Sequence, residues 1–131
     1  MNPKQFLLIG GIVLLALGIV GFLGVFSDTK SAFYLDMGEN VAHTGLGIIA
    51  IAASFVISEG TAQKWLVAAV GVVALFFAVY GFLVAGGTPP NTFGIANLES
   101  PADDILHLVV GIWALAAAFF PRGVMAIAPT T

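Results

Sequence analysis

Long apolar stretches separated by short polar segments dominate this chain. Four such stretches are visible, with approximate bounds Gln5–Phe26, Asn40–Ser58, Lys64–Ala85 and Asp103–Phe120. A bilayer core about 30 Å thick needs about 20 helical residues to cross it, so each stretch is long enough to span. Lipid offers backbone polar groups no partners, and strands this short could not close into a barrel. The pattern therefore predicts an all-α integral membrane protein, a bundle of four transmembrane helices.

The second and fourth stretches open with the same motif. The segment Asn40–Gly47 recurs 64 residues later as Asp104–Gly111, and the only two histidines, His43 and His107, hold the same position in the two copies. An internal repeat of this kind constrains the architecture before any residue is assigned a role. The two imidazoles are expected to be related by a symmetry of the fold.

The first and third stretches are related as well. The segments that begin at Gly11 and Gly21 are echoed 60 residues later by those that begin at Gly71 and Gly81. The offset grows from 60 to 64 because the second hairpin has four more loop residues, around residues 86–90. The first stretch is therefore expected to be a retained helix and not a signal peptide, although a lysine precedes it.

Each repeat is predicted to be a helical hairpin. A hairpin has an even number of spans, so its two copies enter the membrane in the same sense and form parallel repeats. We expect a single membrane domain, residues 1–131, with repeat 1 at about 5–58 and repeat 2 at about 64–120. Both histidines then lie at one depth near the outer surface. The short tail, residues 121–131, is expected to lie on the inner surface or to touch a partner.

The charge distribution predicts an orientation. Lys4, Lys64 and Arg122 fall at the N-terminus, between the second and third stretches, and after the fourth. The other two loops and the adjoining helix starts hold one lysine, Lys30, and six acids: Asp28, Asp36, Glu39, Glu99, Asp103 and Asp104. By the positive-inside rule both termini face the cytoplasm. No basic patch is present to bind nucleic acid. The absence of cysteine excludes disulfides, thiol catalysis and cysteine-ligated iron–sulfur clusters.

Helix-start signals support the alignment of the two copies. Ser100 is predicted to cap the fourth helix, with Pro101 at the first helical position and Asp103 three residues after the cap. Asp36 and Glu39 form the matching cap and acid at the start of the second helix. Acids at these positions also suit the positive end of the helix dipole.

Two copies of Asn/Asp-x-x-His-x-x-x-Gly, each opening the second helix of a hairpin, resemble a family of uncharacterised bacterial four-helix membrane proteins catalogued as a domain of unknown function. Asp103–Gly111 is similar to the family's Asp-Asn-x-Leu-His-x-x-x-Gly signature, from which it departs at Asp104. The first copy begins with Glu39 and Asn40. The resemblance covers nearly the whole chain. It implies the four-helix topology and, with the charge distribution, the bacterial cytoplasmic (inner) membrane, but no activity.

The repeated motif is the candidate site. Its residues are Glu39, Asn40, His43 and Gly47 in the first copy and Asp103, Asp104, His107 and Gly111 in the second. In each copy a carboxylate precedes the histidine by four residues, so it is placed to accept from the imidazole N–H and orient the ring. The glycine four residues after each histidine is expected to leave a gap beside the ring. The structural interpretation is that each histidine ties its helix start to the neighbouring outer loop or to the symmetric helix.

Two ligand-binding interpretations stay open. His43 and His107 on different helices could ligate a haem from both faces, or each could bind a chlorophyll-type magnesium, because imidazole is a common axial ligand. A zinc ion bound by His43, His107, Asp103 and Glu39 has suitable ligand types, but it requires the second and fourth helices to meet at this level. We assign no metal and treat the tetrapyrrole as the main alternative.

Transport and catalysis are weaker hypotheses. A proton or ion path needs polar groups through the membrane, and below the motif the spans offer little beyond Thr44 and Ser54. The sequence has no Ser–His–Asp arrangement with loop support and no phosphate-binding glycine loop before a helix. We therefore expect a small non-catalytic scaffold or accessory subunit. Its expected partners are the lipid bilayer and other membrane protein subunits.

Overall fold

The computed structural model describes residues 1–120, which form four helices. These are α1 (Pro3–Phe22), α2 (Met37–Val56), α3 (Gly60–Val84) and α4 (Ala102–Phe119). Each is long and apolar enough to cross a membrane, which confirms the expected all-helical class with four candidate spans. The expectation for the tail concerns residues 121–131, outside the described part. α1 ends at Phe22 and not at Phe26, because a φ of +77° at Gly24 turns the chain, and α3 begins at Gly60 and not at Lys64.

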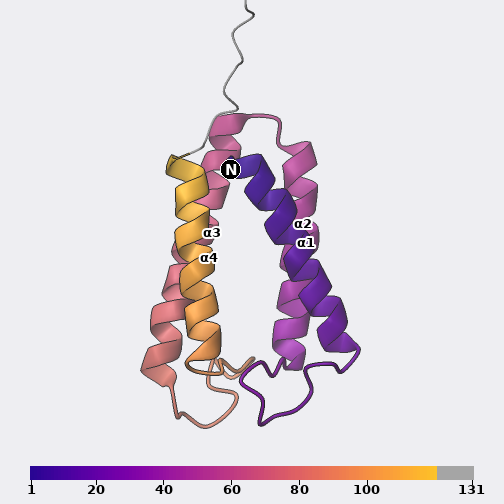
Figure 1. The fold of residues 1–131 in the computed structure, drawn as a ribbon, viewed down its shortest axis with the longest axis vertical. Coiled ribbons are helices and arrows are strands. Elements are labelled where there is room, and N and C mark those ends of the chain that lie inside the picture. The colour runs from indigo at the N-terminus through magenta and orange to yellow at the C-terminus, as the bar shows by residue number, and fades with distance from the viewer. Residues whose placement is uncertain (121–131) are drawn as a thin grey trace, which may run out of the picture.

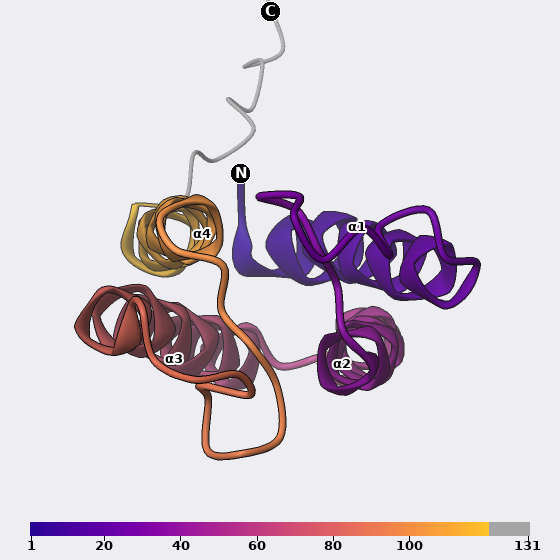
Figure 2. The same ribbon diagram turned by 90° about the horizontal axis from the view of Figure 1, so that it is seen from below.

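The helices associate as two hairpins. α1 packs along α2 and α3 packs along α4, whereas contacts between the two hairpins are sparse. The start of α1 and the end of α4 lie at one end of the molecule, here named the terminal end (Figure 1). Loops 23–36 and 85–101 lie at the opposite end, here named the loop end. Figure 2 is seen from that end, and the loops lie in front of the helices. This up-and-down order requires only short connections between neighbouring helices.

Glycines allow the helices of each hairpin to approach closely. A Cβ atom at Gly47 would lie 2.5 Å from the backbone nitrogen of Leu15 and 2.9 Å from the carbonyl oxygen of Gly11. In the second hairpin, a Cβ at Gly111 would lie 3.1 Å from the carbonyl oxygen of Gly71. Small residues at such crossings let backbones gain dispersion contacts, which drive helix association in lipid. The first hairpin therefore closes through helix backbones, whereas in the second the side chain of Leu75 lies nearest to Gly111.

An apolar core joins the two hairpins near the terminal end. Phe6 and Leu7 of α1 are buried there against Val67 and Ala68 of α3 and against three alanines of α4. The rings of Phe6 and Trp113 meet edge to face, with centroids 4.7 Å apart. Such aromatic pairs add roughly 0.5–1.5 kcal/mol beyond the area they bury. The position of Trp113 agrees with a packing role.

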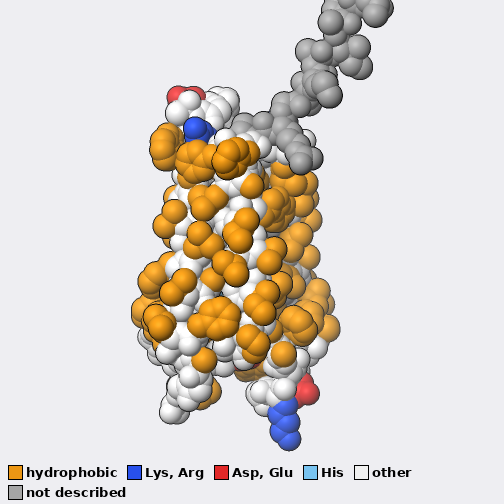
Figure 3. All heavy atoms as spheres, turned by 60° about the vertical axis from the view of Figure 1, so that its left-hand side comes forward, with side chains coloured by type: hydrophobic (Ala, Val, Ile, Leu, Met, Phe, Trp, Pro, Cys, Tyr) orange, Lys and Arg blue, Asp and Glu red, His pale blue; other side chains and the backbone are white. Residues whose placement is uncertain are grey.

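The outer surface of the helices is apolar. Hydrophobic side chains cover the face seen in Figure 3, and charged side chains lie at its two ends. Val56, Leu83 and Phe120 are 78–80% exposed. An exposed apolar patch of this extent is atypical of a soluble monomer and fits the hydrocarbon of a bilayer.

The predicted cap of α2 is confirmed. An Asp36 carboxylate oxygen accepts from the Glu39 backbone N–H at 2.9 Å, and the Glu39 carboxylate accepts from the Asp36 N–H, also at 2.9 Å. This reciprocal pair is a capping box, which satisfies two donors that a helix start leaves without partners. It also holds both carboxylates at the loop end of α2.

The predicted cap of α4 is wrong. The helix begins at Ala102 with Pro101 at the N-cap position, and no side chain caps it. The Asp103 carboxylate instead accepts from the Glu99 backbone N–H at 2.8 Å. Because Asp103 bonds to a residue ahead of Ser100, it ties the incoming loop to the first turn, and the serine hydroxyl is not used as a cap.

Candidate functional site

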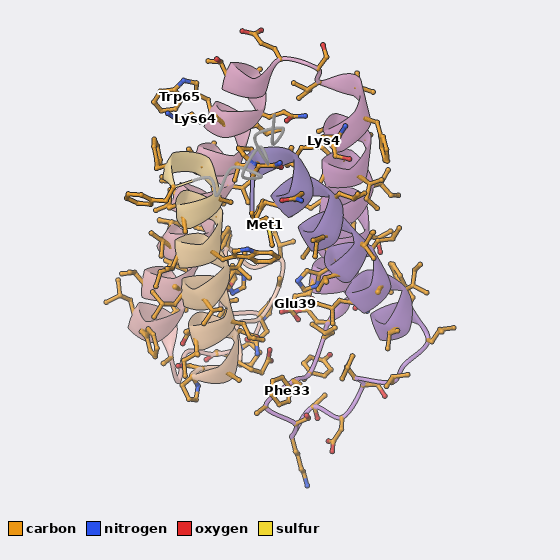
Figure 4. All side chains as sticks on the ribbon, turned by 45° about the horizontal axis from the view of Figure 1, so that its top comes forward. Met1, Lys4, Phe33, Glu39, Lys64 and Trp65 are labelled. Atoms are coloured by element: carbon orange, nitrogen blue, oxygen red, sulfur yellow. The ribbon has the colours of Figure 1, made fainter. Side chains whose placement is uncertain are left out.

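The motif residues divide between two faces of their helices. Asn40 and Asp104 point toward the partner helix of their own hairpin, where they contact α1 and α3. Glu39 and Asp103 approach each other across the space between the hairpins. Figure 4 shows Glu39 in that space, toward the loop end. One sequence motif thus serves packing within a hairpin and contact between hairpins.

On the face turned toward the partner helix, each motif places a side-chain oxygen against a glycine of that helix. A Cβ atom at Gly21 would overlap Oδ1 of Asn40, and a Cβ at Gly81 would overlap Oδ1 of Asp104. Asn40 is 5% exposed and Asp104 is fully buried. Within residues 1–120 these two oxygens have no hydrogen-bond partner. Their close neighbour is the glycine Cα, whose hydrogens are weak donors.

The glycines of the motif do not leave gaps beside the imidazoles, so that prediction is wrong. The space at Gly47 is taken by the α1 backbone, and the space at Gly111 by Leu75 and the carbonyl oxygen of Gly71. The physical reason is that close backbone approach of the paired helix uses the room that a missing side chain provides. The glycines shape the hairpins and do not open a ligand pocket.

Three carboxylates gather at the loop end. One oxygen each from Glu39, Glu99 and Asp103 lies within 4.8 Å of the others. Glu39 is 8% exposed and Asp103 is 6% exposed, so two members are buried. Glu99 was not among the predicted site residues. It precedes Asp103 by four residues, but its place depends on how loop 85–101 folds, and the helical repeat does not predict that.

Loop 85–101 docks on the start of α2 and so joins the two hairpins. The Asn97 backbone N–H donates to the second oxygen of Asp36 at 2.7 Å. Gly38 lies directly beneath the loop, because a Cβ there would be 2.6 Å from the carbonyl oxygen of Ile95. The Asn97 side-chain amide also donates to Glu99. These contacts hold Glu99 over the buried acids.

The carboxyl of Glu99 binds its proton tightly. Burial raises the pKa of Glu99 to about 7, and the negative charges of Asp103 and Asp36 act in the same direction. The hydrogen bond from Asn97 opposes this rise. A hollow of about 390 Å³ adjoins the group and is lined by Tyr34, Asp36, Pro89, Pro90, Asn97 and Glu99, among others. Glu99 therefore titrates near neutral pH beside an opening at the surface.

The two histidines are not hydrogen-bonded to carboxylates within the described residues. Nδ1 of His107 donates to the backbone carbonyl oxygen of Asp103 at 2.8 Å. Nδ1 of His43 is buried and has no partner in that part of the chain. The predicted carboxylate–imidazole bond is therefore replaced by a backbone bond in one copy and by none in the other.

The ligand atoms that do gather favour a hard cation. A site built of carboxylate oxygens suits calcium, magnesium or manganese better than zinc. The four residues considered for zinc do not gather as a set among residues 1–120, because Glu99 and not an imidazole completes the group around Glu39 and Asp103. Nδ1 of His107 is held by a backbone carbonyl, so Nε2 would be the atom with which this residue could hold a metal.

Few buried polar side chains lie toward the terminal end, and they bond to nearby backbone; the Gln63 amide, for example, donates to the carbonyl oxygen of Ile57 at 2.6 Å. Thr44 packs against Gly18 of α1, and the hydroxyl of Ser54 donates to the carbonyl oxygen of Ile51 at 2.7 Å. The space between the hairpins is instead closed there by the core around Phe6 and Leu7. Within the described residues the buried carboxylates are confined to the loop end, and this argues against a path for ions across the molecule.

Fold and site together define the class: an all-helical protein with four helices, each able to cross a membrane, and a polar layer at one end. Comparison of the chain with protein-family models, curated proteins and solved structures finds no match. The resemblance to the uncharacterised bacterial four-helix family therefore stays a prediction.

Proposed function

We propose that the protein is a small, non-catalytic integral membrane protein that acts as a scaffold or accessory subunit of a larger membrane complex. In this proposal it spans the bacterial cytoplasmic membrane four times, as two parallel hairpin repeats with both termini in the cytoplasm. Matching contacts support the repeat: Asn40 meets Gly21 in one hairpin as Asp104 meets Gly81 in the other. Two hairpins with the same sense place these pairs at equal depth.

The main observation that supports this proposal is the docking of loop 85–101 on α2. The hydrogen bond from the Asn97 backbone N–H to the Asp36 carboxylate, at the N-cap of α2, fixes one hairpin to the other. The adjoining acids Glu39 and Asp103 are buried between the hairpins. Buried polar groups that connect elements give a bundle one defined arrangement. A protein whose polar groups hold its own helices together leaves its apolar exterior for lipid and for other subunits.

Purification from native membranes tests the scaffold role. The full chain is extracted in a mild detergent, and its mass on a native gel is compared with that of the same chain expressed alone in a foreign host. We expect a defined complex in the native sample and a smaller species in the foreign host. Deleting the chromosomal gene should shift the partner subunits to a smaller mass. Identical masses in both hosts, with no partner altered by the deletion, would contradict the proposal.

Tetrapyrrole binding through His43 and His107 is the second candidate. The observation that favours it is the Nδ1 bond of His107 to the backbone carbonyl oxygen of Asp103. An axial histidine is oriented in this way by its second nitrogen. The residues could hold a haem iron or a chlorophyll-type magnesium, which would supply redox or light-absorbing chemistry.

An absorption spectrum of the native sample separates the two candidates. A Soret or chlorophyll-type band that disappears in the His107→Leu variant, with an unchanged helical circular dichroism spectrum, establishes the pigment site. A spectrum that contains only tryptophan and tyrosine bands eliminates it and leaves the scaffold role. Leu106→Val is a matched control, because this neighbouring side chain is 50% exposed and offers no ligand atom.

A further inference from the structure

A groove runs along the second hairpin near the terminal end. Its volume is about 420 Å³, and its lining includes Trp65, Ala69, Val72 and Val73 of α3 and Leu115 and Phe119 of α4. From Trp65 to Val73 it follows α3 for about 12 Å, at ~1.5 Å per residue. One leaflet supplies half of a hydrocarbon core about 30 Å thick, so the groove covers most of one leaflet's apolar depth. Its length and lining fit one hydrocarbon chain.

A fixed positive charge lies at the mouth of this groove. Nζ of Lys64 is 5.0 Å from the ring centroid of Phe119 and 5.8 Å from that of Trp65. The two rings meet edge to face, with centroids 6.1 Å apart. Figure 4 shows Lys64 and Trp65 beside each other at the terminal end. Tryptophan is enriched where hydrocarbon meets the headgroups, so the ammonium is placed at headgroup level.

The first hairpin offers a matched comparison. Lys4 is the counterpart of Lys64, and its Nζ lies 6.0 Å from the ring centroid of Phe55. Sixty residues before Trp65 and Ala69, however, the chain has Gln5 and Ile9. The first hairpin therefore has a lysine over a phenylalanine but lacks the tryptophan wall. It also carries a larger side chain where the groove has an alanine.

We propose that the groove beside Lys64 binds one acyl chain of an anionic phospholipid whose phosphate pairs with the Lys64 ammonium. The apolar lining accounts for the chain, and the charge at the mouth selects the headgroup. A basic residue near the membrane surface favours an anionic over a zwitterionic lipid about fivefold. This inference rests on the membrane-spanning arrangement proposed above and adds the chemical class of a bound lipid.

Fluorescence of Trp65 provides the test, because its indole forms one wall of the groove. The chain has two tryptophans, so a Trp113→Phe background leaves Trp65 as the single reporter. The full-length protein is placed in mixed vesicles of dioleoyl phosphatidylglycerol and dioleoyl phosphatidylcholine, with bromine on the acyl chains of one lipid at a time. We expect phosphatidylglycerol to compete for the site about fivefold better than phosphatidylcholine. Equal quenching by the two lipids overturns the proposal.

Three variants test whether the preference for phosphatidylglycerol arises at the groove. Lys64→Gln should reduce the preference to about one, whereas the matched Lys4→Gln should leave it unchanged, because Lys4 belongs to the other hairpin. Ala69→Ile places the residue of the first hairpin in the groove and should also abolish the preference. A preference kept in Ala69→Ile, or lost equally in Lys4→Gln, overturns the proposal.

A second measurement avoids dependence on the Trp113→Phe background. Native mass spectrometry of the unsubstituted protein, released from the same mixed vesicles, compares bound phosphatidylglycerol with bound phosphatidylcholine. We expect the same preference, and equal retention of the two lipids overturns the proposal. Failure of the proposed membrane arrangement has a separate readout, since a chain that does not insert is quenched by neither brominated lipid.

Discussion

Oδ1 of Asp104 occupies the space that a Cβ atom would need at Gly81, so α3 and α4 meet there with no room for a side chain. The same relationship joins Asn40 to Gly21 in the first hairpin. Because the obstructing atoms belong to a buried side chain, a methyl group at either glycine forces the helices apart. The loop-end half of each hairpin depends on this contact.

We predict that Gly81→Ala lowers the free energy of unfolding by about 1–3 kcal/mol, the usual cost of overpacking a well-packed contact. The measurement is an unfolding titration in a mixed micelle of mild detergent and sodium dodecyl sulfate. Gly45→Ala is the control, since a Cβ there meets nothing within 4 Å. Alanine at that helical position should be neutral or stabilising by up to about 1 kcal/mol. Equal destabilisation by both variants would contradict the role of the Asp104 contact.

We predict that Asp104→Asn is tolerated, with a change in the free energy of unfolding below about 1.5 kcal/mol, because the amide has nearly the same shape. The first hairpin already places Asn40 against Gly21 in this way. Asp104→Leu should be more destabilising, since two methyl groups replace planar oxygens against the glycine. The measurement is the melting temperature of both variants in the same detergent. Equal decreases in melting temperature would show that the shape of the side chain at this contact is unimportant.

We predict that stability falls as the pH rises from 4.5 to about 7. The folded protein holds the proton of Glu99 up to a pKa of about 7, whereas an unfolded glutamate releases it near its ordinary pKa of 4.5. The unfolded state therefore binds fewer protons between these values, and the free energy of unfolding decreases with pH. Above about pH 7 Glu99 is ionised in both states, and its contribution to the decrease ends.

Glu99→Gln should reduce this dependence and raise stability above about pH 7, because the amide carries no charge at any pH. Melting temperatures measured from about pH 5 to about pH 8 report the difference. Glu59→Gln is the matched control at the terminal end, where the side chain is exposed. An unchanged slope in Glu99→Gln would assign the titration to another acid of the cluster, such as Glu39 or Asp103.

We predict that Phe6→Ala costs about 3–5 kcal/mol of stability, as expected for truncating a buried aromatic residue. Phe6 is 4% exposed and contacts Trp113, so the variant removes the main aromatic contact between the hairpins. The intrinsic fluorescence of Trp113 should change at the same time. Phe22→Ala, at a position 49% exposed on the same helix, should cost less than about 0.5 kcal/mol. Similar decreases in stability for Phe6→Ala and Phe22→Ala would show that the hairpins are not held together at Phe6.

The four helices could be predicted because lipid imposes long uninterrupted apolar stretches, and such stretches are visible in sequence. The cap at Asp36 could be predicted for a similar reason, since its partners lie within one turn. The place of Glu99 could not be predicted, because it is set by a loop that docks on a helix about 60 residues earlier through the Asn97–Asp36 bond. Helical spacing alone also suggested open space at Gly47, where packing of α1 fills it.

The sparse contact between the hairpins bears on how the chain is assembled during synthesis. Most of the partners of α1 lie in α2, and most of those of α3 lie in α4, so each pair satisfies most of its packing within itself. Contacts that are local in sequence form without waiting for distant segments. During synthesis the α1–α2 hairpin emerges first, and it can complete its packing before the α3–α4 hairpin has been made. Only the late docking of loop 85–101 and the closure around Phe6 require the whole chain.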